Sequence, residues 1–262
     1  MNYQPIEDYG LIGNMRTTAL IGLNGSIDWF CHPRHDSPSI FGAILDGEKG
    51  GHFKIESTVE EDHHKQFYYP ETNILVTRFL CECGVGEVVD FMPLGNSHMR
   101  NWIIRQVRTV RRKITFRVEC YPAFDYARAK HKVKEVSDGV AFVCDRNPCK
   151  DTRPLDPNDD SDQVECQHFE LITNIPLETN DRGAFAEFTL EEGENAVFIF
   201  RPVGQVSASE QFEDLNQAAE TFFHETTLYW RDWLSHCIYT GRWRRRVERS
   251  ALALKLLTYE PT

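Results

Sequence analysis

A β-hairpin signal near the N-terminus most constrains what this chain can fold into. Two β-prone runs, 17–21 and 27–31, are separated by a short turn that contains Asn24-Gly25. Asn-Gly favours a tight turn between antiparallel strands, because both turn residues must accept positive φ. The sequence therefore predicts antiparallel pairing from the start of the chain.

The run after this turn alternates between two faces. A regular strand would place Ile27 and Trp29 on one face and Asp28 and Phe30 on the other. Pro33 then ends the strand, because proline lacks the N–H that a central strand needs. We expect a short helical turn after it.

The middle of the chain repeats the same kind of pattern. Turn signals separate short strand-like runs, expected at 52–56, 66–69, 73–83, 87–92, 101–109, 113–121, 131–136, 140–144, 166–173, 184–190 and 196–201. Arg111-Arg112 is expected to join the strands 101–109 and 113–121 into a pair. Asp138-Gly139 is a second hairpin signal. Many short strands with close turns predict a large antiparallel β-sandwich over residues 1–205.

The pattern becomes helical after this region. From Phe212 to Trp233, apolar residues recur at alternating three- and four-residue steps, which predicts amphipathic linker helices within 206–240, begun by Ser207 or Ser209. A second stripe follows Gly241. The aromatic face of the first stripe either packs on the sandwich or meets a domain outside this sequence.

Composition excludes several classes of protein. The net charge of −11 argues against a nucleic-acid or anionic-membrane partner, and no apolar run is long enough to span a bilayer. The polar N-terminus lacks a secretory signal pattern. Eight cysteines without such a signal predict reduced thiols and a cytoplasmic location.

Several motifs resemble one enzyme family. DYGLIGN, NGSIDW and PRHDSPSIF lie between residues 8 and 41, and further similar segments cover 121–129, 229–234 and 249–259. Together they resemble the glucoamylase- and trehalase-like enzymes of glycoside hydrolase family 15. The family usually has Phe where this chain has His35, and a hydrophobic residue at His32.

The resemblance implies a β-supersandwich followed by an (α/α)6 catalytic barrel. Residues 241–262 would be the first helix of that barrel, truncated here, so we expect the natural protein to continue past Thr262. Family members hydrolyse α-glucosidic bonds with inversion of the anomeric configuration, using two glutamates in the barrel. No Glu of this chain matches either one. The chain alone is therefore expected to be inactive and to need no cofactor.

The resemblance also implies partners. These are the (α/α)6 domain of the same polypeptide, which the sandwich would brace, and an α-glucoside such as a maltooligosaccharide or trehalose. A homodimer through the helical tail is a further expectation.

Five residues are candidates for contact with a sugar at the rim of the cleft. Arg34 and Asp36 lie in a polar loop between two prolines and suit sugar hydroxyls, and Trp29 suits the face of a pyranose ring. Asp125 and Tyr126 form a second polar–aromatic pair after a strand end. The structural alternative is that Arg34 pairs with Asp36 and that Trp29 belongs to the core.

Other motifs are weaker. Cys81-x-Cys83, with Cys144, Cys149 and Cys166, lacks the ligand spacing of a zinc site. Cys81 and Cys83 are interpreted as ordinary thiols, with a redox pair as the alternative. Asp156-x-Asn158-x-Asp160 lacks the glycine of a calcium loop, so no metal is expected. The arginines around Trp243 could indicate RNA binding, but the acidity of the whole chain argues against it. We expect Asp232, Glu225 or a missing domain to supply carboxylates that pair with these arginines.

Two alternatives to the hydrolase domain remain. A free-standing carbohydrate-binding module would present exposed aromatic residues as a platform. A non-enzymatic interaction domain would use its helical tail to dock a protein, through a large exposed apolar patch. Titration with sugars separates the first alternative from a bracing domain.

Overall fold

The computed structural model describes residues 3–59, 62–95, 101–145, 168–203 and 212–260. Its strands are β1 (Tyr9–Gly13), β2 (Thr18–Gly22), β3 (Ser26–Cys31), β4 (Ser39–Phe41), β5 (His52–Ser57), β6 (His63–Tyr68), β7 (Leu75–Cys81), β8 (Gly84–Phe91), β9 (Ile103–Tyr121), β10 (His131–Val136), β11 (Gly139–Cys144), β12 (His168–Thr173), β13 (Glu178–Asn180), β14 (Gly183–Glu191) and β15 (Asn195–Pro202). Its helical segments are η1 (Ile6–Asp8), α1 (Phe124–Ala127), α2 (Leu215–Ser235) and α3 (Arg244–Leu256).

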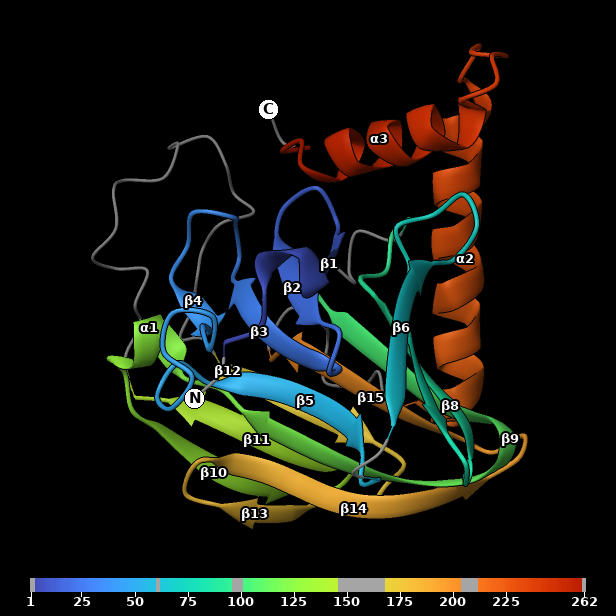
Figure 1. Cartoon of the computed structure of the whole chain (residues 1–262). Helices are drawn as coiled ribbons and strands as arrows, with labels where there is room; N and C mark the ends of the chain where they lie inside the picture. The colour runs from blue at the N-terminus through green and yellow to red at the C-terminus, as the bar shows by residue number, and fades with distance from the viewer. Residues whose placement is uncertain (1–2, 60–61, 96–100, 146–167, 204–211, 261–262) are drawn as a thin grey trace.

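The strands form two antiparallel sheets that face each other and share β9, so that the described strands make one continuous hydrogen-bonded sheet (Figure 1). The first sheet has the order β1-β2-β3-β5-β9-β14-β13, with β4 paired to β3. The second has the order β6-β7-β8-β9-β15-β12-β11-β10. The mainly β, antiparallel fold predicted from the sequence is thus confirmed, as are the turns at Asn24-Gly25 and Asp138-Gly139.

β9 belongs to both sheets, and this corrects the expected strand pair around Arg111-Arg112. The segment is one strand of 19 residues: its first half pairs with β8 and β15, and its second half pairs with β5 and β14. Arg112 has φ of 60°, and the pairing with β8 shifts register between Val85 and Gly86. Such irregularities bend a strand, so β9 passes from one sheet to the other without reversing.

Aromatic side chains fill the space between the sheets. Phe200 stacks on Phe169 with 4.8 Å between ring centroids and lies 5.2 Å from Phe41 and 6.3 Å from Phe53. All four are fully buried. Residues such as these supply most of the hydrophobic stabilisation of a core.

A charged pair lies inside this apolar core. Arg105 and Asp90 are both 0% exposed, with 2.7 Å between Arg105 Nε and Asp90 Oδ1. The Arg105 guanidinium also donates to the carbonyl oxygens of Phe53 and Gly25, at 2.5 and 2.7 Å. One side chain therefore ties the Asn24-Gly25 turn to β5, β8 and β9.

The outer face of the second sheet is also apolar, and α2 covers it (Figure 1). Val197 and Ile199 point outward between the core residues of β15 and pack in the same cluster as Ala219 and Phe222 of α2. Asp214 caps this helix by accepting hydrogen bonds from the first-turn N–H groups, so Ser207 or Ser209 is not the cap. Those two serines lie outside the described residues.

The C-terminal half of α2 packs with α3 on the loops of the sandwich. Trp230, 1% exposed, shares a cluster with Met15, Leu234, Leu252 and Leu256. The expectation that this aromatic face packs on the sandwich is therefore confirmed for Trp230, as it is for Phe222.

The arginine-rich start of α3 finds different partners from those expected. Arg244 Nε lies 2.5 Å from Glu248 Oε1, and Arg249 Nη1 donates to Thr72 O at 2.7 Å. Neither Asp232 nor Glu225 makes these contacts. α3 lies at an angle to α2 (Figure 1), and Arg245 and Arg249 line a pocket with residues of the β6–β7 turn.

Candidate functional site

The loop between β3 and β4 carries two of the sequence candidates and has a defined shape. The Arg34 N–H donates to Ser37 Oγ, and the Ser37 N–H donates to the Arg34 carbonyl, both at 3.2 Å. The His35 N–H donates to Arg16 O at 3.1 Å. The segment leads directly into β4, where the sequence predicted a helical turn. The loop is thus fixed to the sandwich at both ends and in its middle.

Arg34 and Asp36 pair with each other on this loop. Arg34 Nε lies 3.1 Å from Asp36 Oδ1, and Arg34 Nη2 lies 3.3 Å from Asp36 Oδ2. Their side chains are 33% and 73% exposed. The pair therefore presents a guanidinium and a carboxylate to solvent in a fixed relation.

Trp29 does not lie in the core, and the simple alternation expected for its strand is wrong. β3 has a bulge in its pairing with β2, and Asp28 is the extra residue. Because of this extra residue, Ile27 and Phe30 both face the core, whereas Trp29 is half-buried. A one-residue insertion reverses the faces of all residues beyond it.

The turn called α1 holds the other two candidates in an uncommon backbone conformation. Asp125, Tyr126 and Ala127 have φ of 54°, 55° and 62°, so three successive non-glycine residues are left-handed. Each costs about 1–2 kcal/mol relative to the right-handed form. The turn projects Tyr126, which is 42% exposed and lies 6.4 Å from the Trp29 ring between centroids.

Arg128 completes this group, and sequence reasoning did not single it out. Its Nη2 lies 2.5 Å from Asp125 Oδ1, its Nε donates to the Asp125 carbonyl, and its guanidinium lies 5.5 Å from the Tyr126 ring centroid. The spacing of three residues from Asp125, inside the family-like segment 121–129, was the available signal.

The loop and the turn are neighbours, joined by the Ala123 N–H to the Ile40 carbonyl at 2.8 Å, and their charges act on each other. Burial raises the pKa of the Tyr126 hydroxyl; Cys31, Asp125 and Asp36 act in the same direction, while Arg128 opposes them. Burial likewise raises the pKa of the Cys31 thiol to about 12, and the charge of Asp36 adds to this. The structure thus brings together Trp29, Tyr126, Asp36 and their neighbours; we call this group the Trp29–Tyr126 cluster.

His32 shows how a departure from the family pattern is accommodated. It is buried, with its ring 4.9 Å from the Phe169 centroid in an edge-on arrangement. Burial lowers the pKa of His32 to about 3, so the imidazole is neutral near pH 7. In that form it fills the site as an aromatic side chain, where the family usually has a hydrophobic residue.

The two carboxylates of the Trp29–Tyr126 cluster are both engaged in ion pairs. Glycoside hydrolysis needs one protonated and one ionised carboxyl on opposite sides of the bond. Here Asp36 and Asp125 are each held by an arginine. Burial raises the pKa of the Asp90 carboxyl, but that side chain is sealed in the core against Arg105.

The left-handed conformation of Ala127 predicts the direction in which a glycine substitution changes stability. We expect Ala127→Gly to raise the free energy of unfolding by about 1 kcal/mol, because glycine adopts positive φ without steric cost. Urea unfolding measures the change. Ala129→Gly is the control, since Ala129 is not among the residues with positive φ, and it should destabilise. A loss of stability in Ala127→Gly would contradict the left-handed conformation.

The remaining sequence candidates have mixed outcomes. Cys81 and Cys83 are joined in a disulfide, so the interpretation as ordinary thiols is wrong for this pair. Cys149, Cys166 and the acidic motif at 156–160 lie outside the described residues. Within those that are described, no group of three or more His, Cys, Asp and Glu side chains is placed to hold a metal ion, and no helix has the length and apolarity to cross a membrane.

Comparison with known families identifies the chain. The family described as "Trehalase-like, N-terminal" matches residues 1–154, more than half of the sequence. The chain belongs to this family. The resemblance noted from the sequence motifs is thus confirmed, and the match includes both parts of the Trp29–Tyr126 cluster.

Relatives of this trehalase-like N-terminal domain are much longer. It is 30% identical to a trehalase of Thermoplasma volcanium over 99% of this chain and 38% of that protein. It is 33% identical to a trehalase of Mycolicibacterium smegmatis over 99% of this chain and 39% of that protein. The chain therefore spans little more than a third of the length of the curated relatives it matches.

A solved structure matches the fold. A bacterial glucoamylase complexed with acarbose superposes with a TM-score of 0.61 and 10% sequence identity, covering 98% of this chain and 41% of the glucoamylase. At this identity the match establishes the fold, and it includes the helices after the sandwich.

Proposed function

We propose that this chain is the non-catalytic N-terminal domain of a family 15 glycoside hydrolase that hydrolyses an α-glucosidic bond by inversion, with trehalose as the first substrate to test. The observation that carries the proposal is the similarity to trehalases along 99% of the chain but only 38–39% of their length. The chemistry would then reside in a helical (α/α)6 barrel of the same polypeptide, working in the cytoplasm.

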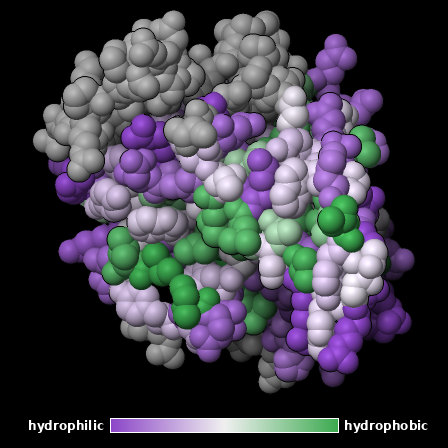
Figure 2. Space-filling view, turned by 90° about the horizontal axis from the view of Figure 1, so that it is seen from above, coloured by the Kyte–Doolittle hydropathy of each residue, from purple (hydrophilic) through white to green (hydrophobic). Residues whose placement is uncertain are grey.

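The proposed division is a sandwich over 1–205, linker helices over 206–240 and the first barrel helix over 241–262. Apolar residues on the last two segments support it, because they are exposed beyond the buried tail core: Ile238, Tyr239, Trp243, Leu254 and Leu257. Ile238 is 94% exposed. Figure 2, which looks onto the α3 end of the molecule, shows apolar patches among the polar residues. The linker and the first barrel helix would meet the rest of the barrel through this surface, and the sandwich, on which both helices pack, would brace them.

The Trp29–Tyr126 cluster supports a second role at the border of the sugar cleft. The half-buried Trp29 ring and the exposed Tyr126 ring, beside a fixed guanidinium and carboxylate, suit a pyranose, which has apolar C–H faces and hydroxyl groups. A strained turn is retained where surrounding structure over-determines it, and such turns cluster at binding sites.

Turnover by the isolated chain tests the proposal. We expect residues 1–262 alone to release no glucose from trehalose, maltose or starch, and the polypeptide extended by the C-terminal region of a trehalase relative to do so. Glucose release measured by a coupled assay checks both. Hydrolysis by the isolated chain would overturn the non-catalytic role, and an inactive but folded extended protein would contradict the hydrolase assignment.

The second candidate function is a carbohydrate-binding module, which the exposed position of Tyr126 beside Trp29 favours. Isothermal titration of the isolated chain with trehalose and maltooligosaccharides separates it from a bracing domain. Saturable binding that is lost in Trp29→Ala and kept in Trp243→Ala would favour the module. If millimolar sugar produces no heat of binding, the bracing-domain function is favoured instead.

A further inference from the structure

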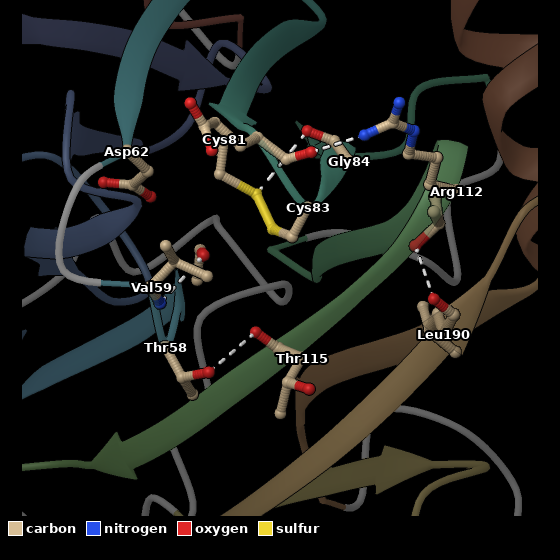
Figure 3. The surroundings of a disulfide bond; sticks show 12 residues. Thr58, Val59, Asp62, Cys81, Cys83, Gly84, Arg112, Thr115 and Leu190 are labelled. Atoms are coloured by element: carbon tan, nitrogen blue, oxygen red, sulfur yellow. Dashed lines mark hydrogen bonds between the residues drawn. A yellow bond between two sulfur atoms is a disulfide. The ribbon is translucent and has the colours of Figure 1, made fainter.

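The turn between β7 and β8 contains a disulfide that closes a very small ring (Figure 3). Cys81 is the last residue of β7 and Cys83 lies two residues later, with their Cα atoms 5.2 Å apart. The β-ladder already closes this turn, because Cys81 pairs with Gly84. A disulfide constrains the unfolded chain less as its loop becomes shorter, so this bond adds little to the constraint that the ladder supplies.

The bond is also accessible. Cys83 and the intervening Glu82 are exposed, and Cys81 is half-buried. Cys31 and Cys120, by contrast, are buried thiols inside the sandwich. Exchange requires that a thiolate reach a sulfur atom of the disulfide. Among the cysteines that the structure describes, only Cys83 is exposed, so a small thiol in solution approaches this disulfide from Cys83.

The turn is connected to the bend of β9. The Arg112 side chain donates from Nη1 to the Glu82 carbonyl at 2.6 Å, and the Arg112 backbone N–H donates to Glu192 Oε2 at 3.1 Å. Arg112 is the residue with positive φ where β9 passes between the sheets. Figure 3 shows its guanidinium directed at the turn that the disulfide encloses.

We propose that Cys81 and Cys83 are a reversible thiol–disulfide exchange site for low-molecular-weight thiols, and that its oxidation state sets the mobility of the β7–β8 turn and of the adjoining Arg112 bend. In the reducing direction a thiolate attacks Cys83 Sγ, the S–S bond breaks, and Cys81 leaves as a thiolate that takes up a proton. A second thiol attacks the mixed disulfide and releases Cys83. Two thiols are thereby oxidised to one small disulfide, and the protein disulfide is reduced to a dithiol; the reverse reaction uses the small disulfide as oxidant.

Glutathione buffers test the exchange on the full chain. The folded protein is equilibrated at a series of ratios of reduced to oxidised glutathione, quenched by acid, alkylated and analysed by peptide mass spectrometry. We expect the peptide with Cys81 and Cys83 to change from no alkyl groups to two in one transition across these ratios. A pair that remains fully oxidised in millimolar reduced glutathione, or fully alkylated in oxidised glutathione, would overturn the proposal.

Amide hydrogen exchange tests the structural consequence. Reduction should speed exchange by about threefold or more around residues 82–84 and 111–113, since a less constrained turn opens more often, and leave β10 unchanged. A Cys81→Ser/Cys83→Ser variant should exchange like the reduced protein under both conditions, whereas Cys237→Ser should respond like the unsubstituted chain. Equal exchange in both oxidation states would refute the link to the Arg112 bend.

Discussion

Arg105→Met is expected to lower the free energy of unfolding by about 3–5 kcal/mol, because it leaves the Asp90 carboxylate buried without its partner. The carbonyl oxygens of Phe53 and Gly25 lose donors at the same time. Methionine has nearly the same length and keeps the core filled, so the loss reports on charge and hydrogen bonds. Urea unfolding followed by circular dichroism measures it.

Two further variants isolate the cause. Arg117→Met lies on the same strand, but its pair with Glu187 is about half exposed on both sides, so a change below about 1 kcal/mol is expected. Arg105→Met/Asp90→Leu removes both charges and should recover part of the lost stability. If the double variant is no more stable than Arg105→Met, the unpaired Asp90 is not the source of the loss.

Trp230→Ala is expected to cost about 3–5 kcal/mol, since it empties the centre of the cluster that joins α2, α3 and the sandwich. The tail is then part of the cooperative fold and not an appendage. Chemical denaturation should show one transition in the unsubstituted chain, at a lower urea concentration in the variant.

Leu228→Ala is the matched control on the same helix. Leu228 is 52% exposed, so its truncation should change stability by about 0.5 kcal/mol or less. A small effect of Trp230→Ala, similar to that of the control, would mean that the tail does not depend on the sandwich in the isolated chain.

Local signals in the sequence predicted the parts of the fold that depend on neighbouring residues. The hairpins at Asn24-Gly25 and Asp138-Gly139 follow from turn chemistry over two residues. α2 follows from an apolar stripe with a period near 3.6 residues. In each case the pattern and the structure it specifies span the same short stretch of chain.

Predictions failed where pairing partners far apart in sequence decide the outcome. Nothing near Arg112 reveals that β9 continues through it, because its two halves pair with strands of different sheets. The bulge at Asp28 depends on β2, and it decided the environment of Trp29. The sequence predicted one strand through Cys81 and Cys83 and interpreted both as ordinary thiols. In the structure β7 ends at Cys81, Cys83 lies in the turn, and the two are joined in a disulfide.

The candidate site shows the same division. The residue types at Trp29, Arg34, Asp36, Asp125 and Tyr126 marked two polar–aromatic segments. That these segments are neighbours, joined through the Ala123 N–H to the Ile40 carbonyl at 2.8 Å, is a property of the folded sheet. Arg128 acquires its role only from the left-handed turn that precedes it.

The sequence by itself determined the family, the antiparallel β class, the hairpin turns and the helical tail, because these depend on motifs and periods carried by contiguous residues. The tertiary structure alone decided that β9 spans both sheets, that the Arg105–Asp90 pair lies in the core and that Trp29 meets Tyr126. The physical reason is that long-range register and burial arise only when strands distant in the chain are brought together.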